Sequence, residues 1–340
     1  MIEFNEAAIR KLIFHKIADD RKSLVNQKTY DIEYEFEEEI LKKIFLKPFN
    51  TCNATYQFTH TIDLELHALY KLAKSIFNAS DFVNTSQQIY HYLKSVSKHQ
   101  NIKDGDLFVI KFDDVKFNGQ LYNAIGIYKI ENKDNFIEIT SKQQDLEMHL
   151  KEGINGRKLD KACLILQTEE PYTILVIDNA KVETDYWQNE FLSVELKDDN
   201  INATNQFLQF AKSYIVEQLP EEFETSKSDQ IELLNRSVQY FKKNDTFHQA
   251  AFEEEVLVDK NIIESFRKYD ETYQLDNDFD FQEKFEISAP AVKKQAKYFK
   301  SVLKLDKNFH IYIHGNTSLI QQGVDDDGRK FYKIYYQEES

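Results

Sequence analysis

Five short runs rich in β-branched and aromatic residues, with little helical pattern between them, most constrain how this chain folds. They are Leu107 to Phe112, Tyr122 to Ile130, Phe136 to Thr140, Ala162 to Gln167 and Thr173 to Asp178. Consecutive parallel strands would need helical crossovers, which these runs do not leave room for. Asn118-Gly119, between the first two runs, is typical of a type I′ turn, which needs positive φ at both central positions. The pattern therefore predicts an antiparallel sheet.

Helical periodicity dominates the sequence after the acidic segment Lys197-Asp-Asp-Asn200. The segments predicted to be helical are 202–216, 226–241, 247–256 and 261–269, with Ser226 as the expected N-cap of the second. The chain is therefore predicted to be an α+β protein with two domains. Residues 1–198 form an N-terminal mixed domain with the antiparallel sheet, and residues 199–340 form a helical domain closed by a β-hairpin.

The N-terminal domain is also expected to contain helices. Residues 34–45 and 81–97 have amphipathic helical patterns, whereas the apolar positions of 9–17 fit either a helix or a strand. The acidic run Glu33 to Glu39 fits a solvated helix face or a partner-binding patch. The single tryptophan, Trp187, is expected to be a packing anchor rather than a platform for stacked bases.

The C-terminal stretch from Asn308 to Tyr336 is patterned as a set of short strands. Apolar and polar residues alternate from Phe309 to His314, Gly315-Asn316 interrupts the pattern, and a β-rich run follows from Lys330 to Tyr336. Asp327-Gly328, just before that run, is a second type I′ hairpin signal. We therefore predict a small β-meander closed by an acidic turn.

The overall charge opposes attraction to nucleic acid, because 58 acidic residues outweigh 43 basic ones and leave a net charge of −15. A contact with DNA would need a local basic face or another protein. The first residues lack the basic-then-apolar pattern of a secretory signal, and no apolar run approaches the ~20 residues of a membrane span. Cys52 and Cys163 lie far apart and form no metal-like spacing. We therefore expect a cytoplasmic protein without membrane contact.

A local basic face is predicted in the last helix, which is expected to begin at Ser288-Ala-Pro290 and to continue to Lys304. Its lysines fall roughly on one side, and three cations of the following hairpin would extend the patch. The predicted nucleic-acid-binding residues are Lys293, Lys294, Lys297, Lys300, Lys304, Arg329, Lys330 and Lys333. The same residues fit an ordinary solvated face, and spacing alone leaves both interpretations open.

Residues of catalytic type occur without the spacing that assembles a site. His60 and His67 are seven residues apart, about two helical turns, which is too far for one metal ion shared with Asp63. Gly153 to Lys158 lacks the Gly-Lys-Ser/Thr ending of a phosphate loop. Asp325 to Asp327 lack the spaced ligands and downstream glutamate of a calcium loop. We therefore predict no enzyme activity, no catalytic residues, no metal and no cofactor.

Several segments match one protein family in the same order along the chain. They are Ile9 to Lys16, Asn202 to Leu219, a lysine-rich helix and strand, Leu-Ile-Gln-Gln-Gly, Asp-Asp-Asp-Gly-Arg-Lys and Phe-Tyr-Lys-Ile-Tyr-Tyr. The last four look like a C-terminal signature, and the first two are similar to the N-terminal and middle segments. Over nearly its whole length the chain resembles the bacterial 37-kDa nucleoid-associated protein family.

The resemblance implies a non-enzymatic component of the nucleoid that binds DNA, either through the local basic face or through DNA-bound proteins. Little base readout is expected, because no helix-turn-helix, zinc finger or other reader motif occurs in the sequence. Nucleoid proteins are the expected partners. A homo-oligomer is also expected, because several weak contacts together would raise its affinity for DNA. The alternative is a protein-interaction scaffold whose acidic face docks a basic, DNA-bound protein without touching DNA itself.

Overall fold

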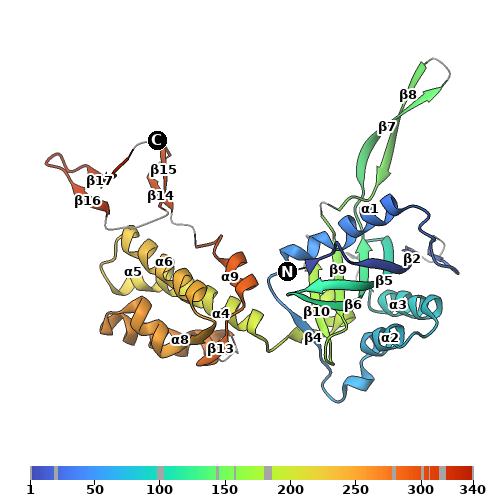
Figure 1. Ribbon diagram of the computed structural model, residues 1–340, viewed down its shortest axis with the longest axis horizontal. Helices are drawn as coiled ribbons and strands as arrows, with labels where there is room; N and C mark the ends of the chain where they lie inside the picture. Colours follow the sequence, from blue (N-terminus) through green and yellow to red (C-terminus); the bar gives the residue numbers. More distant parts are fainter. Residues whose placement is uncertain are drawn as a thin grey trace. The chain divides into compact units, whose positions relative to one another are not determined.

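The computed structural model describes residues 2–18, 22–97, 103–142, 145–156, 158–179, 186–277, 281–299, 302–305, 307–313 and 319–338. The chain divides into two compact units, Met1–Lys197 and Asp198–Ser340. The first unit holds a large sheet with helices, and the second is mainly helical with short hairpins (Figure 1). The α+β class predicted from the sequence is confirmed.

The first unit is built on an antiparallel sheet with the strand order β11-β4-β10-β9-β6-β5-β2-β3 and with β1 paired to β5. The strands are β1 (Ile2–Glu3), β2 (Ala8–Ile17), β3 (Leu24–Val25), β4 (Tyr56–Phe58), β5 (Gly105–Phe117), β6 (Gln120–Ile130), β9 (Lys161–Leu166), β10 (Thr173–Asp178) and β11 (Val194–Leu196). Four of the five predicted runs lie in this sheet, and its pairings are antiparallel as predicted. Residues 9–17, which fitted a helix or a strand, belong to β2.

The third predicted run, residues 136–140, leaves the sheet. It forms β7 (Asp134–Lys142), which pairs with β8 (Asp145–Gly153) in a separate two-stranded ribbon that stands away from the sheet (Figure 1). β8 is not predicted as a strand from the sequence, where charged residues stand between the apolar ones. The large sheet therefore passes directly from β6 to β9.

Helices cover both faces of the large sheet. They are α1 (Glu35–Phe45), α2 (Ala68–Phe77) and α3 (Phe82–Val96), with a 3-10 turn at Lys47–Thr51 and a π-helical turn at Tyr186–Leu192. The predicted helices 34–45 and 81–97 are thus confirmed. Along β9, Cys163 and Ile165 enter the core under α2 and α3, whereas Ala162 and Leu164 enter the core under α1. Trp187 is fully buried in the first of these cores, so its predicted role as a packing anchor is confirmed.

The second unit is a helical body with an aromatic core. Its helices are α4 (Asn200–Ser213), α5 (Leu219–Glu222), α6 (Lys227–Lys243), α7 (Gln249–Phe252), α8 (Lys260–Asn277) and α9 (Ala289–Gln295), with π-helical turns at Tyr214–Gln218 and Glu253–Leu257. The ring centroid of Phe207 lies 4.2 Å from that of Phe247 and 5.0 Å from that of Phe252. Ser226 caps α6 as predicted. The predicted helix 247–256 begins later, at Gln249, because β12 (Thr246–His248) pairs with β13 (Lys284–Glu286) before α7 and the π-helical turn that continues it.

Two hairpins follow α9 in the second unit. β14 (Val302–Leu305) pairs with β15 (Phe309–Tyr312), and β16 (Ile320–Val324) pairs with β17 (Lys330–Ile334). The predicted single meander is therefore wrong, because the described strands form two separate two-stranded sheets. Both hairpins rest on α6 through a small cluster in which Ile231 packs with Ile313, Ile320 and Tyr332. Gly315-Asn316 lies outside the described residues.

The two predicted type I′ turns have different outcomes. Asn118 (φ 51°) and Gly119 (φ 88°) both have positive φ and join β5 to β6 through a two-residue loop, as predicted. In the loop 325–329, all of which is described, only Gly328 has positive φ (77°), and its N–H donates to the Asp325 carbonyl (2.9 Å). One left-handed residue is typical of longer hairpin loops, so the type I′ prediction is wrong there.

Two lysines are fully buried near one end of the large sheet. Lys129 on β6 and Lys161 on β9 are direct cross-strand partners and are at most 1% exposed. The Lys129 Nζ donates to Glu131 Oε1 (2.8 Å), to Tyr186 Oη (3.0 Å) and to a backbone carbonyl. The Lys161 Nζ donates to Asp178 Oδ1 (2.7 Å) and lies 4.9 Å from the Tyr186 ring centroid. Burial lowers the pKa of Lys129. The cluster ties the π-helical turn that begins at Tyr186 to the sheet.

We expect Lys129→Ala to lower the free energy of unfolding of the first unit by about 3–5 kcal/mol, because it leaves the Glu131 carboxylate buried and unpaired. Urea unfolding followed by Trp187 fluorescence measures this change, since the only tryptophan lies in a core of this unit. Lys133→Ala is the control. The ion pair of Lys133 with Asp106 is 40% exposed on the lysine side, so its loss costs less than about 1 kcal/mol. Equal losses in the two variants would contradict the structural role of the buried pair.

His15 is a buried histidine that joins β2 to α3. Its ring is 1% exposed, Nε2 lies 3.2 Å from Ser86 Oγ, and Nδ1 accepts the N–H of Asn26 (3.2 Å). Since Nδ1 accepts, the neutral ring carries its proton on Nε2. Burial, with a smaller contribution from His91, lowers the pKa of His15 from 6.5 to about 4. The folded protein therefore holds this ring neutral at neutral pH.

Because the folded-state pKa lies below the unfolded value, neutral His15 stabilises the fold fully above pH 6.5 and progressively less as the pH falls towards 4. We expect His15→Gln to remove about 2–3 kcal/mol from the stability difference between roughly pH 7 and pH 4.5. Urea unfolding at the two pH values measures that difference. His91→Gln, at an exposed ring on α3, serves as the control and should keep most of the native pH dependence, because burial contributes more than His91 to the lowered pKa of His15. A His15→Gln profile identical to the native one would refute this expectation.

Candidate nucleic-acid interface

The predicted lysine helix is much shorter in the structure. α9 begins after the N-cap Ser288 with Pro290 in its first turn, as predicted, but it ends at Gln295. The chain then turns so that Phe299, 3% exposed, packs in the aromatic core, and strand β14 begins at residue 302. A helix that reaches Lys304 is therefore wrong. Burial of Phe299 and strand pairing with β15 override the local helix propensity.

Residues 288–307 are here called the basic segment. Because α9 ends at Gln295, the lysines of this segment do not share one helical face. Lys293 is exposed and Lys294 half-buried on α9, and Lys297 is exposed in the turn that follows. Lys304 lies on β14. Lys300 lies outside the described residues. Of the predicted cations, the structure thus groups Lys293, Lys294 and Lys297 within about one turn of chain.

A further cation lies beside this group and comes from a distant part of the sequence. Lys212 belongs to α4, which packs against α9. Its Nζ lies 5.9 Å from the ring centroid of Tyr298, which is 59% exposed and adjacent to Lys297. No spacing in the sequence associates Lys212 with the basic segment, because the two are joined only by helix packing.

Arg329, another predicted cation, is engaged by the acidic turn of its own hairpin. Its Nε donates to Asp325 Oδ2 (3.0 Å) and its Nη2 donates to Asp327 Oδ2 (2.7 Å). The backbone N–H of Arg329 also donates to Asp325 Oδ1 (2.8 Å). These exposed ion pairs are weak, yet they offset the guanidinium charge locally. The turn is therefore not a strongly basic extension of the patch.

Lys330 and Lys333, the last two predicted cations, lie on β17 but point to opposite sides of their hairpin. They are three residues apart on one strand, and side chains of a strand alternate between its two faces. The Lys333 Nζ lies 5.0 Å from the Tyr335 ring centroid. The hairpin therefore does not present both lysines on a single surface.

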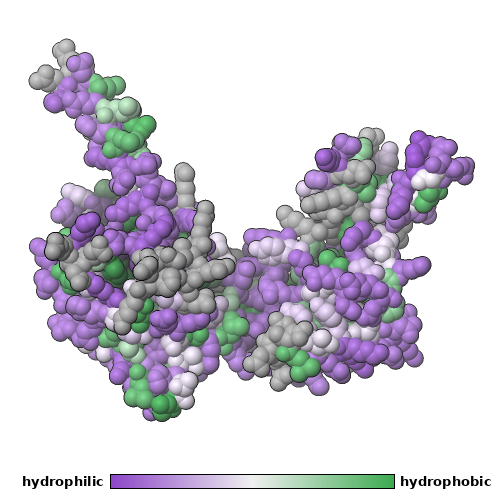
Figure 2. Space-filling model, turned by 180° about the vertical axis from the view of Figure 1, so that it is seen from behind, coloured by the Kyte–Doolittle hydropathy of each residue, from purple (hydrophilic) through white to green (hydrophobic). Residues whose placement is uncertain are grey.

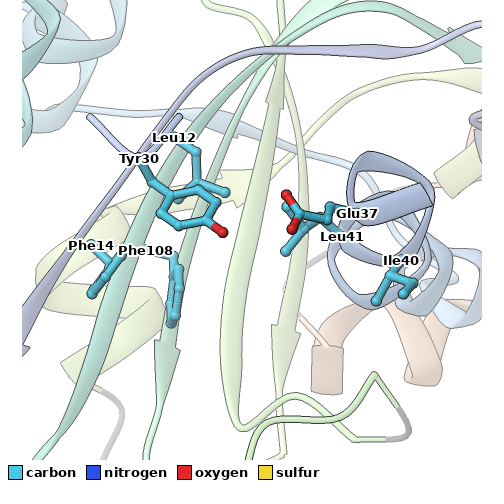
Figure 3. Close-up of a pocket in the computed structure, with 7 residues that line it drawn as sticks. All are labelled: Leu12, Phe14, Tyr30, Glu37, Ile40, Leu41 and Phe108. Atoms are coloured by element: carbon cyan, nitrogen blue, oxygen red, sulfur yellow. The ribbon is translucent and has the colours of Figure 1, made fainter. Parts of the chain in front are cut away.

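An apolar cavity of about 280 Å³ lies beside α1 in the first unit. It is lined by Leu12, Phe14, Tyr30, Glu37, Ile40, Leu41 and Phe108. Figure 3 shows the side chains of β2, β5 and Tyr30 on one side, and the α1 side chains facing them with the Glu37 carboxylate turned towards the cavity. Phe14, Tyr30 and Ile40 remain 39%, 47% and 50% exposed, so their apolar surface is accessible from solvent.

Carboxylates also lie beside this cavity. Glu33, Glu35 and Glu38 line a neighbouring polar hollow of about 350 Å³, together with Arg10 and Lys11. The nearby guanidinium of Arg10 is already paired with Asp113 (2.5 Å). Carboxylates at the start of a helix interact favourably with its dipole, so this acidic cluster is compatible with α1. The arrangement combines an apolar recess with a negative rim.

The residues first considered as metal ligands hold local backbone turns. Asp63 and His60 each accept a nearby backbone N–H. His67, 3% exposed, caps α2 by accepting the N–H of Tyr70 at Nδ1 (3.1 Å), and its Nε2 lies 3.0 Å from the Leu192 carbonyl. Burial lowers the pKa of His67. Within the described ranges, no group of three or more histidine, cysteine, aspartate or glutamate side chains is arranged to hold a metal ion.

Comparison with known proteins supports the resemblance noted in the sequence. A family model described as nucleoid-associated protein YejK matches residues 13–339. No curated protein matches the chain. In the part of the chain that the structure describes, no helix combines the length and apolar character needed to cross a membrane. Because the family match covers nearly the whole chain, this protein belongs to the nucleoid-associated protein YejK family.

Proposed function

We propose that this chain is a non-enzymatic nucleoid-associated protein that contacts DNA through its basic segment. One observation carries the proposal: residues 288–307 contain six lysines and one aspartate, in a chain whose net charge is −15. Family membership supports association with the nucleoid. Exposed Lys293 and Lys297 supply cations for phosphate oxygens, and Lys212 with Tyr298 extends the surface beside them.

The proposed contact is to the DNA backbone rather than to base edges. α9 has seven residues and ends in a turn, so it offers no long recognition helix for the major groove. At physiological ionic strength charges are screened over about 8 Å, so nearby lysines dominate the field at a bound phosphate despite the acidic remainder. Lys300 and Lys304 are included among the proposed DNA contacts only because of their positions in the sequence. Arg329, Lys330 and Lys333 are peripheral to the proposed contact, because Arg329 is paired with two aspartates and the two lysines lie on opposite sides of their hairpin.

The buried lysine cluster supports a non-enzymatic role. Lys129 has a lowered pKa, as catalytic lysines often do. However, its three donors are matched by the acceptors Glu131, Tyr186 and a backbone carbonyl, and the side chain is 0% exposed. A lysine whose donors are all satisfied and which solvent cannot reach is better suited to holding the structure together than to acting as a nucleophile or base.

A second candidate function rests on the apolar cavity beside α1. Its acidic rim and exposed aromatic lining fit a positively charged peptide of a partner protein that carries one large apolar side chain. Such a peptide is expected in the tail or arm of a DNA-bound protein. Through such a partner the chain would join the nucleoid without touching DNA itself. The net charge of −15 favours this route, because it repels DNA and attracts basic proteins.

Binding to a labelled duplex across a salt series tests the direct contact. We expect Lys293→Glu/Lys297→Glu to lose most of the affinity and to lower the slope of log K against log salt by roughly two, since each phosphate contact contributes about 0.9. Lys242→Glu/Lys243→Glu, at exposed positions on α6, changes the net charge equally and controls for overall charge. Equal weakening in both variants, or no binding at low salt, would rule out contact through this segment.

Retention on isolated nucleoids tests the second candidate. Ile40→Glu places a carboxylate among the apolar residues of the cavity, and we expect it to lower retention about tenfold, as loss of one anchoring side chain would. Ile62→Glu, at an 81% exposed isoleucine outside the cavity lining, is the matched control and should retain the protein. If Ile40→Glu is retained while Lys293→Glu/Lys297→Glu is released, the cavity has no part in nucleoid association.

A further inference from the structure

The β7–β8 ribbon presents an exposed apolar face. Residues paired directly across an antiparallel ribbon lie on the same side of it. The register pairs Ile137 with Leu150, Ile139 with Met148, and Ser141 with Leu146. The five large side chains of this set, here called the apolar face, are 58% to 76% exposed. In Figure 2 the ribbon projects from its unit and carries hydrophobic residues among hydrophilic ones.

The opposite face of the ribbon carries Phe136 beside Gly153 and is otherwise polar, with ion pairs among its charged residues. Lys151 forms an ion pair with Glu138 (2.5 Å), and Lys142 forms one with Glu147 (3.1 Å). A strand that alternates so regularly is typical of a sheet with one face in water and one face covered. A lone two-stranded hairpin is only marginally stable in water, so covering the apolar face would stabilise this ribbon. The pattern therefore indicates a docking surface.

We propose that the apolar face packs against the same face of a second copy of this chain, about a two-fold axis, so that two ribbons form a two-layered, four-stranded contact. Each of the five side chains offers on the order of 100 Å² of apolar surface. Two copies would together bury about 1,000 Å², which is the lower limit for a specific interface. The proposal thus describes a dimer of moderate affinity and goes beyond the proposed nucleoid role.

The chemistry of the face favours a second copy over other partners. Its five members carry no charge, so a two-fold axis brings like against like. The one acidic residue on the same side, Glu152 opposite Asn135, lies at one end of the face and is exposed. Nucleic acid is disfavoured, because residues 134–153 contain five acidic residues and two lysines. In a face-to-face packing the charged faces point outwards and are separated by more than the ~10 Å between the stacked layers, which exceeds the Debye length of about 8 Å. Repulsion between the two ribbons is therefore screened.

Analytical ultracentrifugation of the full chain from micromolar to several hundred micromolar tests the proposal. We expect a reversible monomer–dimer equilibrium whose dissociation constant rises at least a hundredfold in Leu146→Ser/Met148→Ser/Leu150→Ser. The matched control is Glu147→Ser/His149→Ser/Lys151→Ser, which changes three alternate residues of the same strand on the charged face. It should keep the native equilibrium. Trp187 fluorescence verifies that the cores of both variants remain folded.

Hydrogen exchange provides a second measurement that does not depend on a variant. Protection of the amides in residues 134–142 and 145–153 should rise with protein concentration in the native chain and stay low in the apolar-face variant. A chain that is monomeric at all concentrations would overturn the proposal. So would a dimer that survives the apolar-face substitutions, or one that both variants weaken equally. DNA binding is measured separately, so failure of the dimer leaves the basic-segment proposal untouched.

Discussion

Burial of both faces of the antiparallel sheet is the constraint on which the first unit depends. All six residues of β9 are buried, so each side chain along it must enter one of two cores. A strand in this position has no solvent side on which to place a charge, yet Lys161 lies on it and Lys129 lies opposite. Both lysines are accommodated because each donates a hydrogen bond to a carboxylate: Lys161 to Asp178, and Lys129 to Glu131. A buried ion pair adds little over an apolar pair but is costly to break, so the cluster mainly specifies where the Tyr186–Leu192 turn docks.

Local patterns were sufficient for some segments whose own chemistry favours one conformation or one environment. Asn118-Gly119 fixes its own turn, and the apolar run at 162–167 indicates a buried strand without reference to its partners. β8 and β14 depend instead on pairing with another strand. β8 alternates charged and apolar residues, which also suits exposed segments. In β14 the lysine-rich pattern fits a helix until burial of Phe299 and pairing with β15 are known.

The candidate interface shows the same division between local and non-local information. The proximity of Lys293 to Lys297 follows from sequence, and the ion pairs of Arg329 had a visible signal in the adjacent aspartates of the turn. By contrast, Lys212 reaches the basic segment only because α4 packs on α9. The cavity beside α1 likewise combines residues of two strands, a loop and a helix, and no spacing along the chain indicates it.

In the proposed arrangement, the basic segment and the dimer together offset the repulsion between an acidic chain and DNA. A few exposed lysines in a chain of net charge −15 give a weak phosphate contact, because the acidic remainder opposes approach to DNA. Two paired chains carry two basic segments, and once one is bound the second meets DNA at a high effective concentration. The pairing surface is apolar, so salt that weakens phosphate contacts by restoring counterions does not weaken the dimer in the same way. The two proposed interactions would therefore be separable by ionic strength: rising salt would release the DNA while the chains stay paired.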